Sequence, residues 1–219
     1  MKILIAFSDK EHLKDFFDML ECTEDTKSFT YKHIDLDFLE TGYTHFETAY
    51  HMGIALHSKS YHLVLFAGLA NSLNTSMRVG DLVNVIKDIP YLTGIQEENE
   101  FKDAYELTWL DRSKFPHQRG AFINMSNSYF NVFLPYMKTA SLSCSSLEGT
   151  EEQVKLKIAQ YPIHIETSNG IGFHYACLSK KLPFYQLRSI AKNLVLKNED
   201  KELALKNLNL HLKDIIDLL

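Results

Sequence analysis

Polar and charged side chains gather where two apolar strands are expected to end. The first strand, 162–167, leads through a turn into a helix over 170–180, and the second strand covers 184–191. In an open α/β sheet, ligands bind outside the carboxyl ends of the strands. Side chains at these two ends can hold a polar ligand, or they can serve only as turn and cap residues. They are Glu166, Thr167, Ser168, Asn169, Arg188 and Lys192.

The elements that must position these side chains alternate between strands and helices. Apolar residues at helical spacing predict helices over 11–20 and 48–58, and a C-terminal helix with a stripe from Leu205 to Leu219. Alternation of this kind predicts a three-layer α/β/α fold whose central sheet is largely parallel and covered on both faces. Further runs of strand length lie at 2–7, 32–36, 62–68, 79–86 and 139–144.

Periodicity fails from residue 90 to residue 120, where charges, aromatic rings and turn residues mix. We expect this stretch to be an excursion of short elements over the core. Repeats and linker-like segments are absent, so the sequence predicts a single domain over residues 1–219.

Composition narrows the class of protein and of partner. The chain has 219 residues, 45% of them hydrophobic and 23% charged, which is typical of a soluble globular domain. A net charge of -5 gives no general attraction to nucleic acid or to an anionic membrane. The apolar start, 1–7, is followed at once by Asp9 and Lys10, and is too short for a signal peptide or a membrane span. We therefore expect a cytoplasmic protein that binds small molecules or other proteins.

Cysteines and histidines do not form metal-site patterns. The three cysteines, Cys22, Cys144 and Cys177, lack CxxC spacing, and we expect them to be reduced thiols. The ten histidines include no HxxxH or HExxH pair. The sequence therefore predicts neither a metal site nor a cofactor.

Several motifs resemble the nucleoside phosphorylase superfamily, and most closely its futalosine hydrolases and methylthioadenosine/S-adenosylhomocysteine nucleosidases. The family's small-residue segment G-[IV]-A-G-[SG] and its following [IV]-G-D-[VL]-V are matched by 68–72 and 79–83. Its TGVG turn is matched by 41–44. The motifs ESMEGAAFxYxC and P-F-x-x-[IL]-R-A-I-S-[ND] of the futalosine hydrolases resemble 166–177 and 183–192. The resemblance covers nearly the whole chain and implies the nucleoside phosphorylase-like fold, with a central mixed sheet.

The resemblance implies hydrolysis of the N-glycosidic bond of a purine nucleoside, menaquinone biosynthesis as the pathway, and a homodimer. In the family, a carboxylate positions or activates water, a Met-Glu pair holds the ribose, and an Asp or Asn contacts the base. These positions fall on His12, Ser168, Asn169 and Lys192, so each of them differs from the family.

The substitutions leave the chemistry open. Glu11 lies one residue before the expected carboxylate, and His12 itself is a candidate base, but both residues also suit the start of a helix. An ammonium at Lys192 opposes the positive charge that develops in the transition state. A desolvated lysine with a lowered pKa would instead be a candidate acid.

Substrate contacts follow from the same resemblance. Thr44 and Asn71 replace glycines of the ligand loops and are expected to narrow the pocket. Glu148 is expected to border the base, and Glu166 and Arg188 are expected to be structural. The remaining expected contacts are Gly68, Leu147 and Thr167, beside Ser168 and Asn169.

Two hypotheses of different classes follow. One is a futalosine-hydrolase-like nucleosidase, and the other is a catalytically inactive relative that binds a nucleoside or a protein partner. A phosphorylase is a weaker third hypothesis, because no basic, glycine-rich phosphate site occurs at 41–45 or 68–72. A cleft of at least ~300 Å³ beside Asn169 and Lys192 would favour nucleoside binding.

Overall fold

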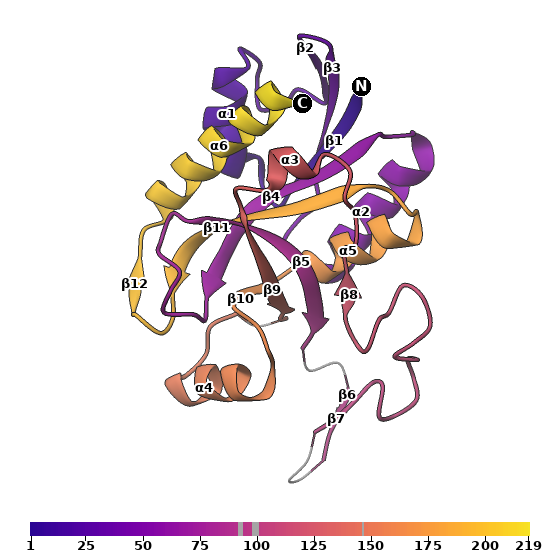
Figure 1. The fold of residues 1–219 in the computed structure, drawn as a ribbon, viewed down its shortest axis with the longest axis vertical. Helices are drawn as coiled ribbons and strands as arrows, with labels where there is room; N and C mark the ends of the chain where they lie inside the picture. The colour runs from indigo at the N-terminus through magenta and orange to yellow at the C-terminus, as the bar shows by residue number, and fades with distance from the viewer. Residues whose placement is uncertain (92–93, 98–100, 146) are drawn as a thin grey trace.

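A central mixed sheet with helices on both faces makes up the computed structural model, which describes residues 1–91, 94–97, 101–145 and 147–219 (Figure 1). The strands are β1 (Lys2–Phe7), β2 (Ser28–Tyr31), β3 (Ile34–Glu40), β4 (Leu63–Ser72), β5 (Leu82–Pro90), β6 (Gly94–Gln96), β7 (Phe101–Asp103), β8 (Phe122–Ile123), β9 (Met137–Ser143), β10 (Ile165–Thr167), β11 (Phe184–Asn193) and β12 (Asn198–Glu199). The helices are α1 (Lys14–Met19), α2 (His45–Ser58), α3 (Phe130–Phe133), α4 (Glu151–Gln160), α5 (Gly170–Ser179) and α6 (Lys201–Leu218), with a 3-10 turn at Lys10–Leu13.

Ten strands of the described chain belong to one sheet, while β6 and β7 form a separate hairpin. Strand β1 pairs in parallel with β3 and β4, and β4 pairs in parallel with β11. Pairing then continues from β11 through β5, β9 and β10 and returns to β4. These five strands therefore close on themselves, and the carboxyl end of β4 lies between the carboxyl end of β11, which is parallel to it, and the antiparallel strand β10.

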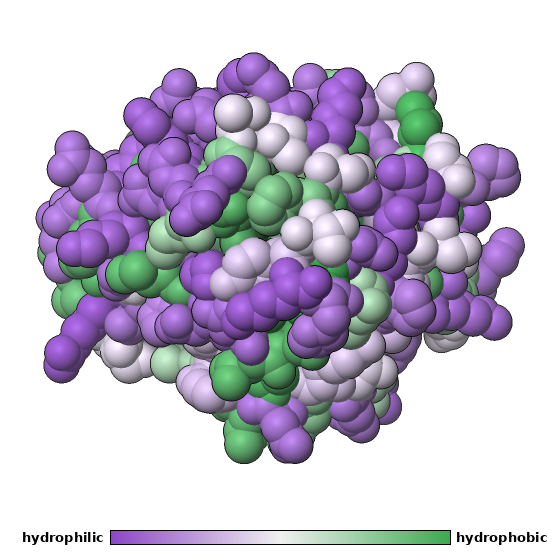
Figure 2. Space-filling view, turned by 90° about the horizontal axis from the view of Figure 1, so that it is seen from above, coloured by the Kyte–Doolittle hydropathy of each residue, from purple (hydrophilic) through white to green (hydrophobic). Residues whose placement is uncertain are grey.

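Side chains of β1 alternate between two cores, as expected for a strand covered on both faces. Ile3 and Ile5 belong to the core under α1 and α6, while Leu4 and Ala6 belong to the core under α2 and α5. The stripe of α6 is buried as the sequence predicts, with Leu212 at 0% exposure. The three-layer α/β/α prediction is confirmed. Figure 2 shows the molecule from above, at 90° to the view of Figure 1. Hydrophilic residues cover most of this face, with hydrophobic patches between them.

Three expected elements have different bounds. The segment 68–72, expected as a ligand loop, is instead the end of β4, because it has strand partners on both sides. The predicted strand 79–86 starts later, at Leu82, and continues to Pro90. The predicted strand 32–36 begins at Ile34 and reaches Glu40. In each case pairing with neighbouring strands, which a single segment does not reveal, sets the bounds.

The excursion predicted from 90 to 120 consists, in its described residues, of the β6–β7 hairpin and a series of turns. It extends away from the sheet below β5 and β8 (Figure 1). Helices in the described ranges are each too short or too polar to span a membrane. The described residues also contain no group of three His, Cys, Asp or Glu side chains placed to hold a metal ion.

Candidate functional site

Three segments expected to share one crevice meet at Asn71. This residue is the strand partner of Glu166 in β10 and of Lys192 in β11. Its side-chain amide donates to Oε1 of Glu166 at 3.1 Å. A bulge between Ile190 and Lys192 shifts the register of β11 at this point. The three segments therefore lie side by side in the sheet.

Asn169, at the expected ribose position, is fully buried and hydrogen-bonded on each side of its amide. Its Nδ2 donates to Oγ of Ser8 at 2.9 Å and to the carbonyl of Gly42 at 3.0 Å. Its Oδ1 accepts from the guanidinium of Arg188 at 2.9 Å. Both amide protons and one acceptor position are therefore used within the protein. Ser8 was not predicted from the sequence, since a serine that ends a strand carries no distinctive signal.

The guanidinium of Arg188 occupies the space that a side chain at residue 68 would need. The guanidinium lies 4.2 Å from the ring centroid of Phe66 and donates to the carbonyl of Leu69 at 3.3 Å. A Cβ at Gly68 would lie 2.7 Å from its Nη1. Burial lowers the pKa of Arg188 to about 9, so the group is still charged at neutral pH. The expectation that Arg188 is structural agrees with these contacts, and Gly68 contacts this cation.

Asp88 is a second buried charged group close to this network. Its Oδ1 accepts from the hydroxyl of Ser143 at 2.7 Å, while Oδ2 has no hydrogen-bond partner. Burial raises the pKa of Asp88 to about 7, against the opposing effects of the Ser143 hydrogen bond and the charge of Arg188. Asp88 was not predicted from the sequence, although a carboxylate at the end of an otherwise apolar strand is a usable signal.

His12, a candidate base in the sequence analysis, is buried. Its Nε2 lies 3.4 Å from the hydroxyl of Tyr43, which in turn donates to Asp9 at 3.0 Å. Burial lowers the pKa of His12 to about 4, so the ring is neutral at pH 7. Glu11 is exposed, and its backbone N–H is capped by Asp9 at 3.0 Å in the 3-10 turn. These contacts place Glu11 as a helix-start residue and leave His12 as the buried candidate base.

Glu166 is fully buried in an ion pair with Lys157 of α4, with 2.6 Å between Nζ and Oε2. Its Oε1 also accepts from the backbone N–H of Glu148 at 2.5 Å. The pair fixes the segment before α4 against β10, in agreement with the structural role expected for Glu166. Lys157 was not predicted, because a lysine on a surface helix usually remains in solvent.

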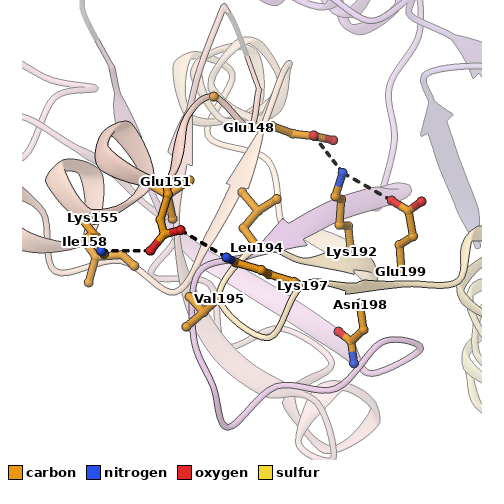
Figure 3. Close-up of a pocket in the computed structure, with 12 residues that line it drawn as sticks. Glu148, Glu151, Lys155, Ile158, Lys192, Leu194, Val195, Lys197, Asn198 and Glu199 are labelled. Carbon is orange, nitrogen blue, oxygen red and sulfur yellow. Dashed lines mark hydrogen bonds and ion pairs between the residues drawn. The ribbon is translucent and has the colours of Figure 1, made fainter.

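Lys192 forms ion pairs with two carboxylates beside an open cavity (Figure 3). Its Nζ lies 2.8 Å from Glu148 and 3.3 Å from Glu199, and 30% of the side chain is exposed. The hydrogen bonds to Glu148 and Glu199 raise the pKa of Lys192. The alternative that Lys192 is a desolvated acid with a lowered pKa is therefore wrong. Two carboxylates and partial hydration favour its protonated form.

The cavity at Lys192 has a volume of about 600 Å³ and lies between α4 and the β11–β12 turn. Its apolar wall includes Val154, Ile158, Leu194 and Val195. Its polar rim carries Glu148, Lys192 and Glu199, and further along Lys197 pairs with Glu151 at 3.1 Å (Figure 3). Asn169 does not line this cavity, so the two positions expected to share one nucleoside have different surroundings.

The other predicted contacts have local roles. Thr44 caps α2, its hydroxyl accepting from the N–H of Glu47 at 3.3 Å and contacting the Glu47 carboxylate at 2.6 Å. The hydroxyl of Thr167 is buried and lies 3.3 Å from that of Ser143. Ser168 is half-buried, and Leu147 is 38% exposed beside Glu148. Thr44 and Thr167 therefore stabilise their own segments, while Leu147 remains available for contact.

Comparison with known proteins rests on structure. No family model and no curated protein matches the sequence. A methylthioadenosine/S-adenosylhomocysteine nucleosidase from Campylobacter jejuni matches with a TM-score of 0.81 at 15% identity, over 100% of both chains. Futalosine hydrolase of Helicobacter pylori matches with a TM-score of 0.72 at 16% identity, covering 100% of this chain and 98% of the other.

A third structure holds a ligand. A D198N mutant of the Helicobacter pylori nucleosidase, with 5′-methylthioadenosine in its active site, matches with a TM-score of 0.74 at 15% identity, over 100% of this chain and 99% of that one. Likeness of this degree in structure, at 15 to 16% identity, shows a shared fold. The protein therefore has the nucleoside phosphorylase-like fold of the methylthioadenosine/S-adenosylhomocysteine nucleosidases and futalosine hydrolase.

Proposed function

We propose that this protein binds a nucleoside-type ligand without hydrolysing its glycosidic bond. The observation that carries the proposal is the environment of Asn169. A hydrolytic site needs free acceptors for ribose hydroxyls and room for an attacking water. The side-chain amide of Asn169 is instead hydrogen-bonded to Ser8, Gly42 and Arg188, and the residue has no exposed surface.

The charge state of Lys192 supports the absence of hydrolysis. Cleavage of a nucleoside passes through a cationic sugar, which neutral or negative groups stabilise better than an ammonium does. Glu148 and Glu199 raise the pKa of Lys192, so it holds its proton more firmly than an ordinary lysine. It is therefore a poor proton donor to a departing base.

The cavity beside Lys192 supports ligand binding. Its volume of about 600 Å³ lies within the range of small-molecule sites. Leu194 and Val195 offer an apolar surface to a flat base, while Lys192 and Glu148 offer a donor and an acceptor to its polar edge. An aromatic base that carries both donors and acceptors suits this combination.

A second candidate, futalosine-hydrolase-like hydrolysis as part of menaquinone biosynthesis, is favoured by His12. With a pKa of about 4, the buried ring has the basicity of an ordinary glutamate, and it lies near the position of the family's carboxylate. In this candidate His12 accepts the proton of water, and the Tyr43–Asp9 chain orients the ring. The charge that a carboxylate would contribute is still missing.

Calorimetry with adenosine, methylthioadenosine and futalosine tests the proposal, together with chromatography for free base in the same samples. We expect binding of at least one nucleoside and no free base, with or without phosphate. Glu148→Gln and Lys192→Met should each weaken binding at least about tenfold, equivalent to ~1.4 kcal/mol. Lys206→Met, an exposed change on α6, serves as the matched control. Release of base would favour the second candidate, and failure of every nucleoside to bind would reject both.

We also propose that the protein forms a homodimer, as the resemblance implies. Helix α2 supports this through three exposed side chains spaced four residues apart. They are Phe46, Tyr50 and Ile54, with 74%, 65% and 50% of their surfaces exposed. Such a stripe on one helix face is typical of a surface that packs against another protein.

A further inference from the structure

A second cavity, whose lining shares no residue with the Asn169 network, collects positive charge in a chain that is acidic overall. It has a volume of about 270 Å³ and lies between the end of β5 and the excursion after it. Its lining, among the residues that the structure describes, includes the cations Lys87, Arg112 and Arg119 and a single carboxylate, Asp103. Since the whole chain has a net charge of -5, this local excess is not a consequence of composition.

Only one of the three cations is neutralised. Arg112 pairs with Asp103, with 2.9 Å between Nη2 and Oδ2. Within the described residues, the side chains of Lys87 and Arg119 have no hydrogen bond or ion pair. Lys87 is also half-buried, where an unpaired ammonium loses part of its hydration without compensation. Among the described residues, the cavity therefore has two cations without a protein partner, the half-buried Lys87 and the exposed Arg119.

Aromatic rings form the rest of the wall. Phe101, Tyr105 and Tyr161 line the cavity, and each is half-buried. The guanidinium of Arg112 lies 5.0 Å from the ring centroid of Tyr105, and the Tyr105 hydroxyl lies 2.9 Å from Nδ1 of His117. These contacts hold the ring of Tyr105 in place before any ligand arrives. A flat apolar group fits against such a wall.

The backbone at Arg119 indicates that an arginine is not there for stability. Arg119 and Gly120 have φ of 53° and 76°, and Gln118 and Ala121 exchange backbone hydrogen bonds of 2.8 and 3.1 Å around them. A two-residue hairpin turn with positive φ at both positions favours Gly, Asn or Asp. Arginine is disfavoured in this conformation, so glycine at this position would be more stable.

We propose that this cavity binds a small aromatic anion, such as an aryl phosphate or an aryl carboxylate. Its anionic group meets Lys87 and Arg119, and its ring lies against Tyr105 and Tyr161. The site is separate from the cavity at Lys192, which has its own lining and paired charges. This inference does not depend on nucleoside binding.

Trp109, the only tryptophan, lies in the same excursion next to Leu110, which lines the cavity, so its fluorescence serves as the reporter. We expect phenyl phosphate or benzoate to change this fluorescence in a saturable way, and the comparison of the two shows which anionic group is preferred. Neutral benzyl alcohol should have no effect. Inorganic phosphate alone should bind at least about tenfold more weakly than phenyl phosphate, because it lacks the ring.

Variants separate a ligand role from a structural one. Lys87→Gln and Arg119→Gln should each weaken binding of the preferred probe at least tenfold, while Arg78→Gln, an exposed arginine in another loop, should not change it. Arg119→Gly should weaken binding to the same extent and yet raise the midpoint of thermal unfolding. Equal affinity in Arg119→Gly and the unmodified protein, or no saturable response to either anion, would overturn the proposal.

Discussion

Single side chains at the candidate site have partners that the family motifs do not reveal. The motif resemblance aligns Asn169 with a ribose-binding carboxylate, and in the structure it hydrogen-bonds to Ser8, Gly42 and Arg188. An amide both donates and accepts, so it satisfies a carbonyl and a guanidinium together, which a carboxylate cannot do. Asparagine at this position therefore links Ser8, Gly42 and Arg188 inside the protein.

Restoring the family residues tests whether the ribose position is closed. We expect Asn169→Glu combined with Lys192→Asp to remain inactive towards methylthioadenosine. Arg188 would pair with the new glutamate, and the position would stay buried. Circular dichroism checks that the variant is folded. Base release by the folded double variant, but not by the unmodified protein, would show that the pocket is open and only the catalytic groups are missing.

Asp88 gives stability a pH dependence with a defined sign. The pKa of Asp88 is about 7 in the folded protein, against an ordinary value of 3.8, so the folded state binds the proton more tightly. Its contribution to stability therefore falls as the pH rises from about 4 to about 7, and the loss is complete above that. The lowered pKa of His12, about 4, acts in the opposite sense and removes stability as the pH falls below about 6.5.

We expect Asp88→Asn to raise the free energy of unfolding at pH 8 by about 1 to 3 kcal/mol, and by less at pH 5. Asparagine keeps the acceptor for Ser143 and removes the buried charge. Urea unfolding at both pH values measures the difference. An equal effect at the two values would mean that the carboxyl is not protonated in the folded state near neutral pH.

At the scale of elements, the sequence predicts the order of seven strands and four helices but not every boundary, and it does not predict helix α4 or the short strands β2, β8 and β12. Strand β1 and helix α6 were recognised because their apolar residues recur with a clear period. The sequence predicts a loop at the end of β4, because the small residues Gly68, Ala70 and Ser72 resemble a ligand loop. Its strand conformation depends on β10 and β11, which lie far away in the sequence.

Site residues outside the motifs were harder to predict for a related reason. Lys157 lies on α4 among charged neighbours, and only the approach of β10 makes it a buried partner of Glu166. Asp88 lies near the expected end of β5, and its proximity to Gly170 of α5 depends on the packing of the helix against the sheet. Periodicity reports which face of an element is buried, but not which element covers it.

The buried ion pair between α4 and β10 predicts a large effect from one substitution. Lys157→Met should lower the free energy of unfolding by about 3 to 5 kcal/mol, because it leaves Glu166 charged and unpaired in the interior. Lys155→Met on the same helix removes an exposed pair with Glu151 and should cost at most about 1 kcal/mol. Adding Glu166→Gln to Lys157→Met should recover part of the loss. Similar effects of the two single changes would contradict the structural role of Lys157.

At the scale of the whole molecule, the exposed stripe on α2 makes the dimer testable. The chain has a mass of 25.3 kDa, and we expect light scattering after gel filtration to give twice that value. Tyr50→Glu should shift the protein towards the monomer, because it places a charge in the centre of the stripe. Leu210→Glu changes an exposed leucine on α6 and should leave the mass unchanged. A monomer in all three proteins would reject the dimer, whereas a dimer that survives Tyr50→Glu would place the interface elsewhere.

The fold and the site lead to one central claim, that a nucleosidase scaffold here binds its ligand and leaves it intact. The most direct measurement is a single-turnover experiment with the protein in excess over methylthioadenosine, in which free adenine is followed by chromatography and bound nucleoside by equilibrium dialysis. We expect the nucleoside to bind and to be recovered intact after prolonged incubation. If the unmodified protein forms adenine and His12→Asn does not, the claim of binding without hydrolysis is contradicted, and His12 is established as a working base.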